Sequence, residues 1–333
     1  MNTVNKREFL AQAAALMGAS LLPFSRPASA EPPPETKRIR LLKRTAICNA
    51  PAFIAEDLLR AEGFSEVEYI KQDRVRGASA IAEGLADITL WDVFATLPVM
   101  DVGKPVVVLA GIHAGCWELF ANGRVDELSN LKGKTVAIRD FNLGDHVLLS
   151  SMLAYVGINR STVNWVKGPT FADGLRLFVE GKADAYMAFA PQGQALRAKK
   201  IGRVIVDTAQ DRPWSQYYCC VAIGHRDFVR AHPVATKRAL RALLKATDLC
   251  AQRPEEVARV LAEKGYEARY DLALEVLKSL PYDRWRNANA EDTLRFHANR
   301  LYEVGMIMTP PNKLISQGTD WRFLNELKKE LKA

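Results

Sequence analysis

The sequence predicts an α/β protein of two lobes, built on mostly parallel sheets, with a helical C-terminal region. Short β-branched strands alternate with amphipathic helices at the spacing of βαβ units. This alternation starts a second time at residues 131–157 (LKGKTVAIRDFNLGDHVLLSSMLAYVG). Beyond residue 223 the pattern is almost wholly helical, and helices without strands cannot form a further sheet.

The first series of elements runs from residue 37 to residue 110. Ala50-Pro51 opens its first helix and Gly63 ends that helix, because proline suits a helix start and glycine a helix end. The expected elements are, in order, a strand at 37–46, a helix at 50–62, a strand at 67–70, a helix at 77–83, a strand at 86–91, a helix at 93–102 and a strand at 106–110.

The second series begins in the stretch 131–157. Its expected elements are a strand at 135–138, a helix at 145–155, a strand at 163–166, a helix at 171–180, a strand at 183–189, a helix at 192–198 and a strand at 203–206. A strand at 214–223 then carries the chain back to the first lobe. We expect the helices that follow, at 234–251, from Pro254, at 291–305 and at 321–331, to pack on the first lobe.

The N-terminus has the layout of a cleaved signal peptide. Lys6 and Arg7 form a basic segment, residues 9–22 an apolar one, and Ala28-Ser29-Ala30 a small-residue cleavage site. The order NKREFL is similar to a twin-arginine signal with lysine in place of the first arginine, so the Sec and twin-arginine routes both stay open. We expect a periplasmic protein that begins near Glu31 and, without a cysteine after the cleavage site, has no lipid anchor.

Composition argues against several classes of protein. The hydrophobic share of 48% and charged share of 25% are ordinary for a globular chain. Cleavage removes three basic residues and one acidic residue, so the net charge falls from +8 to +6. This excess is spread along the chain, which predicts no nucleic-acid partner, although a positive field would help to collect small anions. We expect a monomer.

Five cysteines are present, and none stands in a CxxC pattern or at a Cys/His ligand spacing. We therefore expect no metal site and no cofactor, and most of the cysteines to be buried, inert thiols. The odd count leaves at least one free thiol unless two chains pair. A disulfide between the adjacent Cys219 and Cys220 would be strained.

The stretch 131–157 is the first candidate for a binding site. A strand that runs into a helix N-terminus presents free N–H groups and the positive end of a helix dipole to an anionic or strongly polar ligand. The stretch has no GxGxxG or P-loop pattern, so a nucleotide site is not expected. The alternative is an ordinary βα unit of the core.

Several further segments together resemble a known family. They are EGLADITLWD (83–92), VVVLAGIHAGCWELFA (106–121), LKGKTVAI (131–138), LFVEGKADAYMAFAP (177–191), DRPWSQYYCC (211–220) and GTDWRFLNELKKELKA (318–333). In this order they are similar to periplasmic substrate-binding proteins of ABC importers, in the branch for nitrate, sulfonate, taurine and thiamine-pyrimidine precursors. The resemblance covers nearly the whole mature chain.

The resemblance implies the two-lobed periplasmic-binding-protein (type II) fold, with two crossover strands. A signal peptide would occupy residues 1–30, the first part of lobe 1 residues 31–115, lobe 2 residues 116–215, and the return to lobe 1 with the C-terminal helices residues 216–333. A small-molecule solute would bind between the closing lobes and pass to an ABC-importer permease in the inner membrane.

The resemblance also implies which strand ends and helix starts face the ligand. In lobe 1 and at the first crossover these are Cys48, Asn49, Trp91, Asp92, His113 and Trp117. In lobe 2 and at the return crossover they are Asn142, Gly144, Asp145, His146, Phe189, Gln192, Tyr217 and Tyr218.

Each candidate also has a purely structural interpretation. Trp91, Trp117 and Phe189 could be core or hinge packing, Asp145 the N-cap of its helix, His146 a solvated residue and Cys48 a small buried filler. Asp92 would repel a bare sulfonate or nitrate, and it favours a ligand that carries an amine or a pyrimidine-type donor. Arg139 could face an anion or point to solvent.

Three functions compete at this point. The first is a transport receptor for a small polar or zwitterionic organic solute, such as a sulfonate or taurine, a nitrate-type anion, or a pyrimidine or aromatic compound. The second is a sensor subunit for a membrane kinase. The third is an enzyme related to thiamine-pyrimidine synthesis, but no Ser/His/Asp or Cys/His spacing supports catalysis, and the cysteine-rich motif of those enzymes is absent. We expect no enzyme.

Overall fold

Strands of the computed structural model form a two-stranded, a three-stranded and a five-stranded sheet in the residues that it describes, which are 31–44, 46–72 and 77–332. The signal peptide expected at residues 1–30 lies outside the described residues. Contacts group residues 34–333 into one unit. None of the described helices combines the length and the apolar character that a membrane span requires.

The first lobe contains the two smaller sheets. β1 (Arg38–Leu42) pairs in parallel with β2 (Glu66–Ile70). β10 (Tyr218–His225) lies antiparallel between β3 (Ile88–Asp92) and β4 (Val106–Ala114). The helices between these strands are α2 (Ala50–Ile54), α3 (Glu56–Ala61), α4 (Ala78–Ala82) and α5 (Val93–Asp101), with a 3-10 turn, η1 (Ile47–Asn49), before α2. Every residue of β4 is buried, which explains its continuous apolar sequence.

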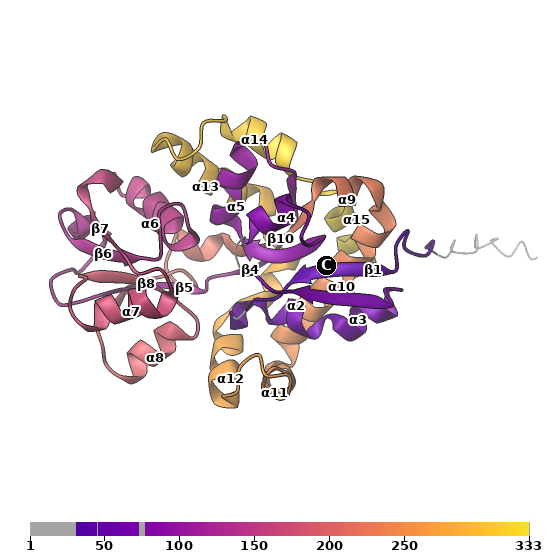
Figure 1. Cartoon of the computed structure of the whole chain (residues 1–333), viewed down its shortest axis with the longest axis horizontal. Coiled ribbons are helices and arrows are strands. Elements are labelled where there is room, and N and C mark those ends of the chain that lie inside the picture. Colours follow the sequence, from indigo (N-terminus) through magenta and orange to yellow (C-terminus); the bar gives the residue numbers. More distant parts are fainter. Residues whose placement is uncertain (1–30, 45, 73–76, 333) are drawn as a thin grey trace, which may run out of the picture. The chain divides into compact units, whose positions relative to one another are not determined.

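The second lobe is built on the five-stranded sheet, in the order β7-β6-β8-β5-β9, and Figure 1 labels the first four of these strands. Its strands are β5 (Trp117–Ala121), β6 (Thr135–Ile138), β7 (Asn164–Lys167), β8 (Ala185–Phe189) and β9 (Arg203–Asp207). Its helices are α6 (Gly144–Tyr155), α7 (Phe171–Val179) and α8 (Gln192–Ala198). A capping box between Thr170 and Asp173 starts α7.

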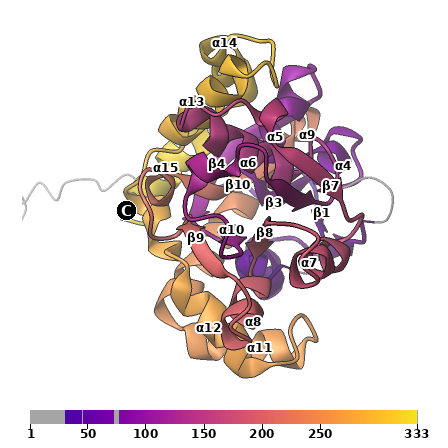
Figure 2. The ribbon, with the colours of Figure 1, turned by 90° about the vertical axis from the view of Figure 1, so that its left-hand side faces the viewer.

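The C-terminal helices pack mainly on the first lobe. They are α9 (Arg226–Ala231), α10 (Pro233–Gln252), α11 (Pro254–Glu263), α12 (Tyr270–Ser279), α13 (Ala290–Glu303), α14 (Pro311–Gly318) and α15 (Arg322–Glu330), with a 3-10 helix, η5 (Tyr282–Arg286), between α12 and α13. α10 contacts α2 and α3, and α13 contacts α5 as well as α6 of the second lobe. α13 and α14 lie beside α5, and α11 beside α12 (Figure 2).

The predicted alternation of strands and helices in two series is confirmed, and two details differ. The sheets are mixed, because β10 in the first lobe and β5 in the second run antiparallel to their neighbours. The helix expected at 50–62 is interrupted at Ala55, whose ψ of −9° departs from the helical value and divides it into α2 and α3. The lobe boundaries stay a prediction.

Candidate ligand-binding pocket

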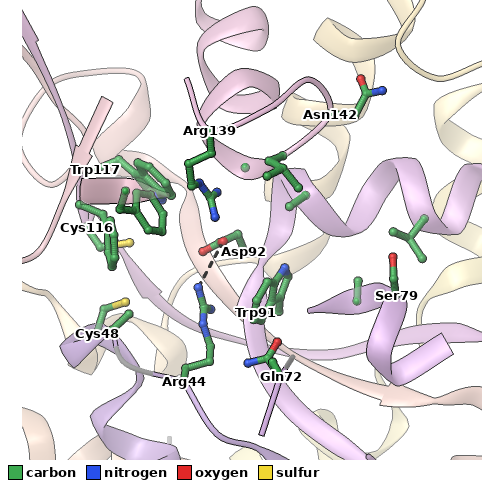
Figure 3. Close-up of a pocket in the computed structure, with 18 of the residues that line it drawn as sticks. Arg44, Cys48, Gln72, Ser79, Trp91, Asp92, Cys116, Trp117, Arg139 and Asn142 are labelled. Carbon is green, nitrogen blue, oxygen red and sulfur yellow. Dashed lines mark hydrogen bonds and ion pairs between the residues drawn. The ribbon is translucent and has the colours of Figure 1, made fainter. Parts of the chain in front are cut away.

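A cavity of about 380 Å³ lies between side chains of both lobes. The first lobe contributes residues that follow β1, the end of β3, and residues of α4 and α5, and the second contributes the loop between β6 and α6, the start of α7 and the end of β8. Figure 3 shows that Arg44 and Arg139 approach Asp92 from opposite sides of this cavity. Strand ends and helix starts are where α/β proteins bind small molecules.

The guanidinium of Arg44 lies over the indole ring of Trp91. Its guanidinium carbon lies 3.8 Å from the centroid of the indole, and its side chain is 13% exposed. Among the described residues, the guanidinium makes polar contacts of 3.5 Å to the Leu90 carbonyl and to Asp92 Oδ2, and both are long for hydrogen bonds. Stacking positions the group while its N–H donors stay available, as in sites that recognise carboxylate, sulfonate or phosphate groups.

Arg139 occupies an equivalent position on the second lobe. Its guanidinium carbon lies 3.8 Å from the centroid of Phe171, and Asp145 accepts hydrogen bonds from its backbone N–H (2.8 Å) and its Nη2 (3.1 Å). Nε of Arg139 is buried and has no hydrogen-bond partner among the described residues. The first residue of α6, Gly144, also lines the cavity, so the positive end of that helix dipole adds to the field.

Asp92 is a buried acid between these two arginines. It is 4% exposed, and Cys220 Sγ donates to its Oδ1 at 3.7 Å. Burial raises the pKa of Asp92 to about 6, against the opposing effect of Arg44. At neutral pH the Asp92 carboxylate is thus a poorly solvated hydrogen-bond acceptor. A hydrogen-bond donor on the ligand would stabilise it.

Aromatic rings form the wall of the cavity at the second lobe. The centroids of Phe171 and Phe189 are 4.1 Å apart, and that of Trp117 is 5.6 Å from Phe189. The buried indole Nε1 of Trp117 has no hydrogen-bond partner within the part of the chain that the structure describes. Because buried N–H groups are rarely left unpaired, this donor and Arg139 Nε indicate a ligand in the cavity.

Gly77 packs directly against the indole ring of Trp91. A Cβ on Gly77 would lie 2.0 Å from Trp91 Cε2, and the φ of Gly77 is +62°. A side chain at this position would therefore displace the indole that holds Arg44. Only glycine fits both the backbone conformation and the close approach.

Gly77→Ala is expected to lower the free energy of unfolding by about 2 to 4 kcal/mol, from backbone strain plus overpacking against Trp91. Urea unfolding measures this change. The matched control is Gly84→Ala, since Gly84 has a φ of +69° but no atom lies within 4 Å of the position that its Cβ would take. Equal losses in the two variants would contradict the role of Gly77 as a support for Trp91.

Two cysteines line the cavity and belong to a buried cluster of thiols. Cys48 follows β1 and Cys116 follows β4, and a third thiol, Cys220 on β10, lies behind them. Hydrogen bonds from Cys116, and then from Cys219 and Cys48, lower the pKa of the Cys220 thiol well below its usual range. All five cysteines of the chain are buried and free, so the expectation that most are buried is confirmed.

Half of the predicted site residues line the cavity. The lining set is Cys48, Trp91, Asp92, Trp117, Asn142, Gly144 and Phe189. The seven others, Asn49, His113, Asp145, His146, Gln192, Tyr217 and Tyr218, are not among its lining residues. The lining set comes from separate segments of the sequence, which the fold brings together.

Three of the seven lie one layer behind the cavity in the second lobe. Asp145 holds Arg139 and is not the N-cap of α6, whose N-cap is Leu143. His146 is fully buried between Phe141 and Trp165, and burial lowers its pKa to about 4. Gln192 accepts a hydrogen bond from the Tyr186 hydroxyl at 2.7 Å.

The other four lie in the first lobe or at the return crossover. Asn49 donates to Cys48 Sγ at 3.4 Å, and Nδ1 of His113 lies 3.0 Å from the Ala114 carbonyl oxygen. Tyr217 stacks on Phe296 with centroids 4.1 Å apart. The Tyr218 hydroxyl donates to the Arg284 carbonyl at 2.9 Å.

Sequence reasoning missed Arg44, Gln72, Ser79 and Phe171, which also line the cavity. The first strand was expected to continue to residue 46, so Arg44 was placed inside it and was not considered as a residue at its end. In the structure β1 ends at Leu42. An arginine directly after the first strand of a βα unit was the available signal. Arg139, for which the sequence left two interpretations, faces the cavity.

Comparisons with known proteins agree with this architecture. The family model described as NMT1/THI5 like matches residues 59–257. The nitrate-binding protein NrtA from Synechocystis PCC 6803 is 16% identical over 90% of each chain, with a TM-score of 0.73. The aliphatic sulphonate binding protein SsuA from Escherichia coli is 18% identical over 85% of this chain and 92% of its own, with a TM-score of 0.67.

A Candida albicans protein with the generic periplasmic binding protein fold is 14% identical over 85% of this chain and 96% of its own, with a TM-score of 0.69. At these identities the likeness is one of fold, and the predicted periplasmic-binding-protein fold is confirmed. No curated protein sequence gave a significant match.

Proposed function

The chain belongs to the NMT1/THI5 like family, and on that premise we propose that it is the periplasmic solute receptor of an ABC importer. It binds a small polar or zwitterionic organic solute between its lobes and delivers that solute to a membrane permease. The similarity in fold to nitrate-binding and sulphonate-binding proteins supports this proposal.

One observation carries the proposal. A guanidinium group from each lobe, stacked on an aromatic ring, lines the same cavity, and each has N–H groups that make long contacts, or none, with the part of the chain that the structure describes. An acidic ligand group bound by both would gain contacts from both lobes at once. Since a ligand stabilises the conformation in which it makes more contacts, such a ligand favours closure.

The cavity suits an organic acid better than a bare inorganic anion. Its volume of about 380 Å³ is in the range of pockets that hold small organic ligands. Phe171, Phe189 and Trp117 offer ring surfaces for an apolar or flat body, and Asp92 offers an acceptor for an amine or amide donor. We therefore favour sulfonates, amino sulfonates and aromatic acids over nitrate.

A thermal-shift screen of the mature protein tests the receptor function. The panel contains alkyl and aryl sulfonates, taurine, nitrate, aromatic carboxylates, pyrimidines and flavins. A compound that binds only the folded state adds about 2.7 kcal/mol of stability at one hundred times its Kd. We expect an organic acid to give the largest shift. Chemical turnover of a panel compound would instead favour the enzyme alternative, and the sensor alternative predicts binding without uptake in cells.

A further inference from the structure

Four potential metal ligands converge at the floor of the solute cavity. They are Cys48, His113, Cys116 and Cys220, whose donor atoms all lie within 4.8 Å of one another. All four are buried, with exposed fractions between 0 and 7%. They come from the turn after β1, the end of β4, the crossover to β5, and β10, so no short sequence motif contains them.

The histidine has the orientation of a metal ligand. Its Nδ1 lies 3.0 Å from the Ala114 carbonyl oxygen, which can only accept, so Nδ1 carries the proton. In the neutral imidazole the lone pair is then on Nε2, and Nε2 is buried without a hydrogen-bond partner among the described residues. Ligating histidines commonly donate their second ring N–H to a backbone carbonyl in this way.

The backbone at Cys116 has a strained conformation, which is a feature of many functional sites. Cys116 has a φ of +93°, which is uncommon for a residue other than glycine. The preceding Gly115 has a φ of +75°, and a Cβ there would lie 2.6 Å from the Cβ of Ala209. Neighbouring structure thus holds the turn that brings the Cys116 thiol beside the other donors. Strain of this kind is concentrated at functional sites.

We propose that Cys48, His113, Cys116 and Cys220 bind one zinc ion as a Cys₃His site. Thiolate and imidazole donors in a tetrahedral set select Zn²⁺ over hard cations such as Mg²⁺ or Ca²⁺. Zn–S bonds of about 2.3 Å place tetrahedral sulfur ligands about 3.8 Å apart, which small side-chain rotations can reach from the observed spacing. Binding releases to solvent the protons that the thiols and Nε2 of the imidazole carry in the metal-free protein.

Charge around the cluster is compatible with this site. Three thiolates and a neutral imidazole leave the zinc complex with a net charge of about −1. Arg44 lies close enough for the charges of Cys48, Cys116 and Cys220 to act on it, so its guanidinium compensates the complex. Cys48 and Cys116 line the solute cavity, and an ion can enter from there.

The test uses the full chain exported to the periplasm, isolated and then loaded with Zn²⁺ or Co²⁺ under reducing conditions. We expect one zinc ion per chain after dialysis, and for Co²⁺ the visible bands of a tetrahedral site with thiolate charge transfer. Cys48→Ser is expected to weaken zinc binding more than about 100-fold, since loss of an outer partner alone costs about 10- to 100-fold. Cys250→Ser is the matched control, because Cys250 is buried outside the cluster.

Three results of these metal-binding measurements would overturn the proposal. They are less than half an ion per reduced wild-type chain, a Co²⁺ spectrum without thiolate charge transfer, and equal zinc affinity in Cys48→Ser and Cys250→Ser. The wild-type spectrum does not depend on whether a variant folds.

Cys116 Sγ lies 2.6 Å from Cys219 Sγ. A Cys116–Cys219 disulfide in the isolated protein, found by alkylation and mass spectrometry, would also overturn the proposal, since that bond removes a ligand.

Discussion

Replacing Arg44 with glutamine is expected to weaken binding of the strongest organic acid of the panel by roughly 30-fold or more. Removing one partner of a desolvated charge pair costs about 2 to 5 kcal/mol, which includes the cost of leaving the ligand charge unpaired. Arg44 meets these conditions, because its side chain is 13% exposed and stacked on Trp91. Isothermal titration calorimetry measures the change.

Arg38→Gln is the matched control. It removes the same charge from β1, the strand that precedes Arg44, but the Arg38 side chain is 53% exposed and pairs with Glu68 away from the cavity. We expect its affinity for the acid to stay within about twofold of the wild type, because exposed charges are screened. If both variants lose affinity equally, the effect comes from overall charge and not from the cavity.

Asp92→Asn is expected to raise the free energy of unfolding of the ligand-free protein at pH 7 by roughly 3 kcal/mol, the equivalent of a pKa displaced from 3.8 to about 6. The folded state binds the Asp92 proton more tightly than the unfolded state does. Wild-type stability is therefore lost as pH rises from about 4 to about 6, and the asparagine variant lacks this loss. Urea unfolding of both proteins between pH 4 and pH 7 measures the difference.

Asp87→Asn provides the contrast. Asp87 accepts the backbone N–H of Arg40 at 2.8 Å and pairs with its guanidinium at 2.5 Å. Its replacement is expected to destabilise the protein at pH 7, because it breaks an ion pair and leaves Arg40 without its partner. A stability gain in Asp87→Asn, or a loss in Asp92→Asn at pH 7, would contradict the different environments assigned to the two acids.

Much of the fold could be predicted because its signals are local. The strand 135–138 and the helix 192–198 have the predicted bounds, since β-branched runs and helix periodicity depend on neighbouring residues. The antiparallel direction of β5 and β10 is not local. It depends on which strands pair after the chain crosses between the lobes. The hydrophobic periodicity of a segment contains no information about its pairing partner.

The predicted site residues that line the cavity lie at strand ends, as Trp91 and Asp92 do, or at the loop and helix start, as Asn142 and Gly144 do. Trp91 and Asp92 are the last two residues of the buried strand β3 and line the cavity. Asp145 and His146 stand at the predicted helix start, but their side chains do not line the cavity. Asp145 accepts a hydrogen bond from Arg139, and the His146 ring packs against Trp165. The cysteine and histidine cluster could not be predicted, because its four members are up to 172 positions apart and only tertiary structure joins them.

Hydrogen exchange of the backbone, with and without the strongest acid of the panel, tests most directly whether both lobes hold the solute in this cavity. Bound solute is expected to slow exchange in two segments at once, residues 88–97 of the first lobe and residues 139–147 of the second. Residues 284–299, which line a separate surface hollow, serve as the internal reference and should not change. Protection confined to one lobe, or to residues 284–299, would contradict the account.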